Sequence, residues 1–115
     1  MVEMEEDINK VIEEYQTVQE QLKTLSSQLS QFKIQLTEIE KAKAEVSNAE
    51  GKVFLTIGGV LVETTKEKAL NDLNEKYDLY KTRIESITKQ YNQLKEKNDA
   101  LTKKITDLYN KGELK

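Results

Sequence analysis

The sequence contains no cysteine, histidine, proline or tryptophan. Without Cys and His there are no thiol nucleophiles, no disulfides, no imidazole acid–base groups and none of the commonest zinc ligands. Without Pro, no helix is interrupted by the strongest helix breaker. Paired acids such as Glu5-Glu6 and Glu13-Glu14 fall on solvated helix surface, where nothing desolvates them for acid–base work. We therefore expect no catalytic residues, no metal and no cofactor.

Long apolar runs are also missing. No stretch approaches the roughly 20 apolar residues that a helix needs to cross a bilayer. The first seven residues, Met-Val-Glu-Met-Glu-Glu-Asp, are acidic where a signal peptide would be basic. We therefore expect a cytoplasmic protein that has no membrane partner.

Two heptad runs of similar length make up most of the chain. Apolar residues at positions a and d repeat every 3.5 residues over more than three heptads, which predicts a coiled coil. In the first run these positions hold Met4, Ile8, Val11, Tyr15, Val18, Leu22, Leu25, Leu29, Phe32, Leu36, Ile39, Lys43 and Val46. In the second they hold Leu70, Leu73, Tyr77, Tyr80, Ile84, Ile87, Tyr91, Leu94, Asn98, Leu101, Ile105 and Leu108. Only Lys43 and Asn98 are not apolar or aromatic.

The composition, 37% apolar and 34% charged over 115 residues, is typical of a long-helix protein. We predict one structural unit covering residues 1–115, with helices over 4–49 and 65–110. Gly51 and Gly112 follow the two runs, where a C′ residue belongs. The segment from Thr64 to Glu67 matches a capping box at the start of the second helix.

Residues 53–64 form a short apolar segment divided by Gly58-Gly59, which is typical of a β-hairpin with a two-residue turn. The turn would pair Ile57 with Val60 and Leu55 with Val62, leaving one wholly apolar face. Such a hairpin is marginal alone and has two open edges. It can pack against its own helices, but joining hairpins from other subunits into a closed barrel satisfies the edges better. The expected assembly residues are Val53, Phe54, Leu55, Ile57, Val60, Leu61 and Val62.

A hairpin reverses the chain, so the two helices should pair antiparallel. Measured from the hairpin centre, residues whose numbers sum to 116 should lie level, and every such pair joins an a position to a d position. Lys43 then faces Leu73, with its stem over the seam and its ammonium in water. Asn98 faces Val18, where a lone buried Asn enforces register.

The net charge of −3 conceals an imbalance between the two halves. Residues 1–50 hold eleven acids and five bases, whereas residues 66–115 hold nine acids and twelve bases. The helices should therefore attract each other. A basic surface for nucleic acid is an alternative, but the bases are interleaved with acids and form no concentrated patch. We expect no nucleic-acid partner.

The helix ends farthest from the hairpin should carry a wider apolar surface than the rest of the coil. Ile12 and Tyr109 occupy e positions there, whereas Gln19, Ser26 and Lys33 occupy e positions farther along. These residues either close the last turns of the coil or form a small, adaptable apolar binding surface. The predicted tip residues are Val2, Met4, Ile8, Val11, Ile12, Ile105, Leu108 and Tyr109.

The central sequence Val53-Phe54-Leu55-Thr56-Ile57-Gly58-Gly59-Val60-Leu61-Val62-Glu63-Thr64-Thr65-Lys66-Glu67-Lys68-Ala69, between two coils, resembles the β-type subunits of archaeal prefoldins. The resemblance implies a hexamer of two α-type and four β-type subunits, whose hairpins form a β-barrel. It also implies a chaperone that holds unfolded client proteins at its coiled-coil tips without ATP and delivers them to a group II chaperonin. A purely structural coiled-coil scaffold or tether is the alternative.

Overall fold

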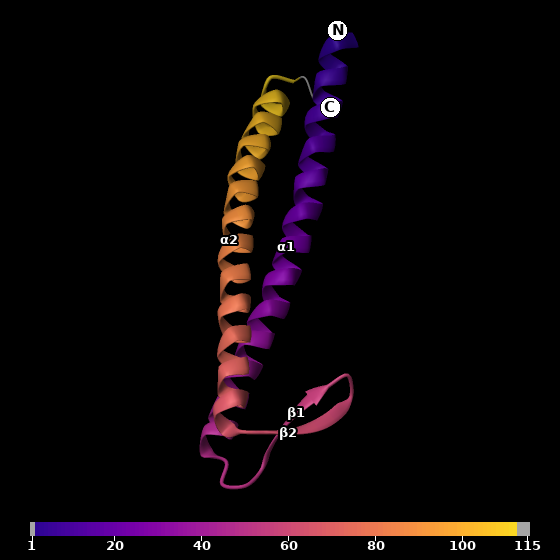
Figure 1. Ribbon diagram of the computed structural model, residues 1–115. Helices are drawn as coiled ribbons and strands as arrows, with labels where there is room; N and C mark the ends of the chain where they lie inside the picture. The colour runs from indigo at the N-terminus through magenta and orange to yellow at the C-terminus, as the bar shows by residue number, and fades with distance from the viewer. Residues whose placement is uncertain (1, 113–115) are drawn as a thin grey trace. The chain divides into compact units, whose positions relative to one another are not determined.

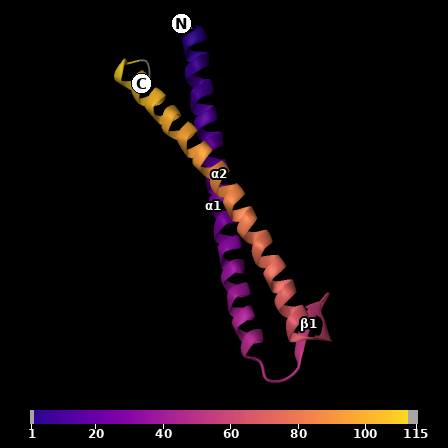
Figure 2. The same ribbon diagram turned by 60° about the vertical axis from the view of Figure 1, so that its left-hand side comes forward.

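The computed structural model describes residues 2–112, and their side chains from residue 7 onward. Helix α1 covers Val2–Asn48, strand β1 covers Val53–Ile57, strand β2 covers Val60–Thr64 and helix α2 covers Lys66–Asn110. The chain runs along α1, reverses at the hairpin and returns as α2 (Figure 1 and Figure 2). The predicted fold class, two long helices joined by a central hairpin, is confirmed.

The chain divides into two compact units, each built from both helices. The terminal unit comprises Met1–Leu29 and Ile87–Lys115, and the hairpin unit comprises Ser30–Ser86. That residues 1–115 act as a single unit stays a prediction. Within each unit, every a and d side chain from residue 7 to residue 110 is buried or half-buried. The heptad assignment therefore identifies the helix seam correctly.

The core of the terminal unit is a cluster of seam residues. Val11, Val18 and Leu101 are buried there, and Val18 is only 1% exposed. Four half-buried residues pack against them: Tyr15, Leu22, Leu94 and Ile105. Asn98 accepts a hydrogen bond from the side-chain amide of Gln19, so the one amide in the second heptad seam has a partner.

The hairpin unit adds aromatic and cationic contacts to its seam. The rings of Phe32 and Tyr80 lie 5.6 Å apart between centroids, and the guanidinium of Arg83 lies 5.8 Å from the Phe32 ring. The ammonium of Lys43 lies 5.1 Å from the Tyr77 ring centroid. Lys43 is thus held by a cation–π contact, in addition to the stem packing that we expected.

The register agrees with the prediction to within about one helical turn in both units. Gln19 and Asn98 in the terminal unit have numbers that sum to 117. In the hairpin unit, the numbers of the contacting residues Phe32 and Tyr80 sum to 112, and those of Lys43 and Tyr77 sum to 120. These values lie on either side of the predicted 116, as expected where each side chain packs between neighbours on the facing helix.

The hairpin has the predicted register in full. Ile57 pairs with Val60, Leu55 with Val62 and Val53 with Thr64, in an antiparallel two-stranded sheet. Gly58 has φ 56° and Gly59 has φ 83°. Positive φ at both central residues is the requirement of a type I′ turn, whose twist matches that of the flanking strands.

Two details of the helix ends differ from the sequence prediction. The backbone N–H of Lys68 donates to the Thr65 hydroxyl at 3.1 Å, so Thr65 rather than Thr64 caps α2. Lys68 then stands at N3, and a lysine cannot return the bond that a capping box requires. Gly51 is not a left-handed C′ residue, because α1 already ends at Asn48 and Ala49 donates to the Val46 carbonyl. Gly112, with φ 73°, does end the second run as predicted.

The register can be checked by a disulfide inside the hairpin unit. Phe32 and Ile84 are half-buried d and a residues whose numbers sum to 116, so cysteines at both positions should lie close enough to crosslink. We expect rapid disulfide formation within one chain under mild oxidation, measured by a mobility shift on a denaturing gel. The matched control combines Ile39→Cys with Ile84→Cys, which are one heptad out of register within the same unit. Faster crosslinking of the control would contradict the register.

Candidate functional site

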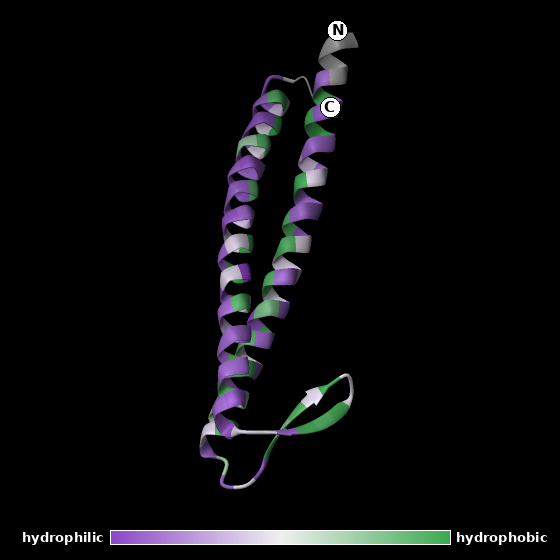
Figure 3. Ribbon diagram, in the orientation of Figure 1, coloured by the Kyte–Doolittle hydropathy of each residue, from purple (hydrophilic) through white to green (hydrophobic). Residues whose placement is uncertain are grey.

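The hairpin exposes its apolar side chains. Five large ones, Phe54, Ile57, Val60, Leu61 and Val62, are between 43% and 70% exposed. Val53 and Leu55 are half-buried. Figure 3 shows both strands mostly in the hydrophobic colour, in contrast to the mixed colours of the helices. The alternative that the hairpin buries its apolar face against its own helices is therefore not what the structure contains.

The cross-strand pairs place most of this apolar surface on one side of the sheet. The pairs Ile57–Val60 and Leu55–Val62 share a face, whereas Glu63 lies on the other face, opposite Phe54. The Lys52 ammonium lies 3.9 Å from the Glu63 carboxylate, and both side chains are well exposed. A two-stranded sheet with an exposed apolar face and two open edges is a surface suited to association with other β structure.

A groove in the terminal unit is the second candidate surface. It has a volume of about 440 Å³ and is called the tip groove below; it is lined by Asp7, Ile8, Lys10, Val11, Glu14, Lys104 and Leu108. Its apolar part comes from seam residues, and its rim carries two acids and two bases. A groove of this kind can accept an apolar side chain together with charged neighbours of either sign.

The predicted tip residues differ in how far they are exposed. Ile8 and Val11 are 8% and 6% exposed, because they pack into the seam and present only one edge to the groove. Ile12, Ile105 and Leu108 are half-buried.

The other three predicted tip residues are Val2, Met4 and Tyr109. Tyr109 is 66% exposed and is the most accessible of the predicted tip side chains that the structure describes. The side chains of Val2 and Met4 lie outside the described residues. The described tip thus offers a small apolar surface rather than a broad one.

The basic rim of the tip groove was not identified from the sequence. Lys10 occupies a c position and Lys104 a g position, and both lie on the same flank of the coil as the g residues Asp7 and Glu14. The heptad assignment already places these positions together, so it could have revealed the mixed rim. The side-chain descriptions from residue 7 to residue 112 include no group of acidic residues that could hold a metal ion. In the helical stretches described, no segment is apolar enough over sufficient length to cross a membrane.

Comparison with known proteins decides the family. The family model described as prefoldin subunit matches residues 9–112, which covers most of α1, the hairpin and all of α2. The chain belongs to the prefoldin subunit family.

Relatives within the prefoldin family support the resemblance to β-type subunits. The chain is 41% identical over 54 residues to prefoldin subunit beta of Pyrococcus abyssi, covering 47% of this chain and 46% of the relative. It is 40% identical over 53 residues to prefoldin subunit beta of Pyrococcus furiosus, covering 46% of this chain and 45% of the relative. The aligned part of the chain therefore spans about half the length of the curated relatives that it matches.

Solved prefoldin structures share the fold over a longer range. The crystal structure of the prefoldin beta subunit from Thermococcus strain KS-1 matches with a TM-score of 0.81 and 29% identity, covering 88% of this chain and 90% of that one. The prefoldin beta2 subunit from the same strain matches with a TM-score of 0.70 at 20% identity, covering 79% of this chain and 98% of that one, and shows the fold alone. The predicted relationship to archaeal prefoldin β-type subunits is confirmed.

Proposed function

We propose that this chain is a subunit of an ATP-independent holdase chaperone. In this proposal the hairpin assembles with α-type prefoldin subunits and with further copies of this chain. The tips capture unfolded proteins and pass them to a group II chaperonin in the cytoplasm. The observation that carries the proposal is an exposed apolar hairpin in a chain that belongs to the prefoldin subunit family.

The hairpin supports the assembly part of the proposal. Side chains such as Ile57 and Val60, about 60% exposed, would be removed from water if hairpins from several subunits joined into one sheet or barrel. Closure would also satisfy the backbone groups at both open edges. The stoichiometry of two α-type and four β-type subunits is taken from the family resemblance.

The terminal unit supports the client-binding part. The tip groove has an apolar floor and a charged rim, and Tyr109 adds an exposed aromatic ring on the opposite flank. One such tip is too small to hold a protein tightly. Several tips on one assembly would bind one unfolded chain at several points and gain affinity by multivalency.

A structural scaffold or tether remains the second candidate. It is favoured by the burial of Ile8 and Val11, which shows that part of the predicted tip surface closes the coil. A scaffold would use the hairpin to assemble but would not bind unfolded proteins.

The double variant Ile12→Ser with Tyr109→Ser tests the tip. Both residues occupy e positions, so the seam and the length of the helices stay unchanged. We expect roughly tenfold weaker binding of a labelled, permanently unfolded protein, measured by fluorescence anisotropy, because two apolar contacts are lost.

The matched control is Ile34→Ser with Leu79→Ser in the hairpin unit. These side chains are 59% and 49% exposed and occupy positions outside the a and d seam, so the control removes comparable apolar surface elsewhere. It should bind the client as the unmodified protein does. Equal weakening by both double variants would argue against a binding site at the tip.

A further inference from the structure

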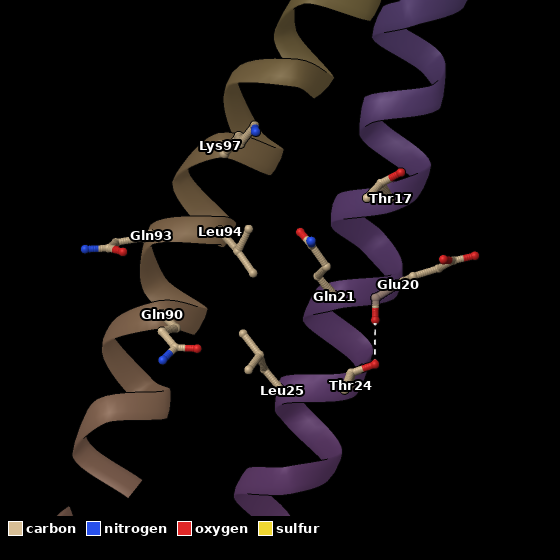
Figure 4. Close-up of a pocket in the computed structure, with 9 residues that line it drawn as sticks. All are labelled: Thr17, Glu20, Gln21, Thr24, Leu25, Gln90, Gln93, Leu94 and Lys97. Atoms are coloured by element: carbon tan, nitrogen blue, oxygen red, sulfur yellow. Dashed lines mark hydrogen bonds between the residues drawn. The ribbon is translucent and has the colours of Figure 1, made fainter. Parts of the chain in front are cut away.

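The terminal unit has a second groove, whose lining residues differ from those of the tip groove. It has a volume of about 610 Å³ and is called the amide groove below; it is lined by Thr17, Glu20, Gln21, Thr24, Leu25, Gln90, Gln93, Leu94 and Lys97. Figure 4 shows Leu25 of α1 and Leu94 of α2 pointing toward each other between the helices. The amide of Gln21 reaches from α1 toward α2. The groove therefore has an apolar floor and an amide on its wall.

The amides of this groove are available to a ligand. Gln21 and Gln90 are exposed g residues. Neither side chain forms a hydrogen bond with another residue whose side chain the structure describes, residues 7–112. Thr24 is different, because its hydroxyl already donates to the Glu20 carbonyl at 3.1 Å. A glutamine amide both donates and accepts hydrogen bonds, so it complements the N–H and C=O groups of an extended peptide whatever the peptide's sequence.

The amide groove and the tip groove lie on the same flank of the terminal unit, and an ion pair links their linings. Glu14 lines the tip groove and Lys97 lines the amide groove, and their side chains form an ion pair at 2.9 Å. Both partners are about half exposed. An exposed ion pair of this kind contributes little energy, so a ligand that occupied both grooves could displace it at small cost.

We propose that the amide groove is a second subsite for the same unfolded client chain, holding its backbone beside the apolar side chain that enters the tip groove. This inference rests on the proposed client-binding function. The occupant is an extended polypeptide, because the two grooves lie on one flank and the amides match a peptide backbone. On α1 the grooves run from Asp7 to Leu25, roughly 27 Å at 1.5 Å per residue. An extended peptide covers that length with about eight residues at 3.3 Å each.

Two peptides of different length test the inference on the full-length chain in its assembled complex. One has ten polar residues with a single leucine near one end, and the other keeps only the five residues around that leucine. A photo-reactive amino acid is placed at Lys10 on the tip groove or at Gln21 on the amide groove. The control position is Ser26, which lines a groove of about 360 Å³ on the e flank.

We expect both peptides to crosslink from Lys10, and only the ten-residue peptide to crosslink from Gln21, several-fold above Ser26. Crosslinks from Lys10 alone, or equal yields from Gln21 and Ser26, overturn the second subsite and leave the proposed function standing. No crosslink from any of the three positions overturns both.

A pair of variants gives an independent readout. Gln21→Ala with Gln90→Ala removes two amides from the groove, whereas Gln16→Ala with Asn92→Ala removes two exposed amides from b positions of the same helices. The first pair should bind the ten-residue peptide several-fold more weakly and the five-residue peptide equally well. The second pair should change neither affinity. If the two variant pairs bind the ten-residue peptide with equal affinity, the inference is overturned.

Discussion

Replacing Leu55 or Val62 with aspartate is expected to abolish assembly while both helices remain folded. These residues pair across the strands on the apolar face of the hairpin. If that face is buried between subunits, an unpaired carboxylate there costs several kcal/mol, which a marginal two-stranded sheet cannot offset. The mass of the particle, measured by light scattering after size-exclusion chromatography, should fall to that of unassembled subunits. Helical circular dichroism should be retained.

The control for this experiment is Thr56→Asp. Thr56 pairs with Leu61 on the other face, where Glu63 already places a carboxylate. The control should assemble nearly as well as the unmodified chain. An unchanged particle mass for both Leu55→Asp and Val62→Asp would show that the subunits associate through another surface.

Deleting residues 1–12 together with 105–115 is expected to abolish capture of unfolded proteins without preventing assembly. The deletion removes the tip groove floor at Ile8, Val11 and Leu108, together with Tyr109. It leaves the hairpin unit, Ser30–Ser86, unchanged. The shortened seam still contains the buried Val18 and Leu101. Particle mass should fall only by the deleted residues, and the affinity for an unfolded client should drop by at least about a hundredfold if several tips act together.

A truncated complex that assembles and binds the client at full strength would place the binding surface elsewhere. A truncated chain that fails to assemble would show that the terminal unit contributes to association, contrary to the assignment of assembly to the hairpin. Helical circular dichroism of the truncated chain distinguishes loss of assembly from loss of folding.

The fold was predictable because its determinants are periodic or local. A 3.5-residue repeat specifies which side chains face the partner helix, so the buried Val18 and Leu101 both fall at d positions. The hairpin register follows from its two-residue turn. This turn requires positive φ at both central residues, and Gly58 and Gly59 adopt such angles. With the turn centred there, the level of the two helices was predictable to within about one helical turn.

The tip and the helix ends were harder to predict, because they depend on small differences in packing. The heptads place Ile8 in the seam, but how much of its side chain stays accessible at the tip depends on how closely the helices approach, and a heptad label does not contain that distance. Likewise, two adjacent threonines can each cap a helix, and only the backbone shows that Thr65 receives the Lys68 N–H. The amide groove depends on the spacing between Leu25 and Leu94, which no sequence motif specifies.

The central claim is that the assembled protein holds unfolded chains at its tips without ATP, and light scattering by an aggregating client tests it most directly. A chemically unfolded protein is diluted into buffer without nucleotide, alone, with the intact complex or with the complex lacking residues 1–12 and 105–115. The account predicts suppression of scattering by the intact complex at near-stoichiometric amounts, and none by the truncated complex. The same rise in scattering with the intact complex as with buffer alone would contradict the account and favour a structural scaffold.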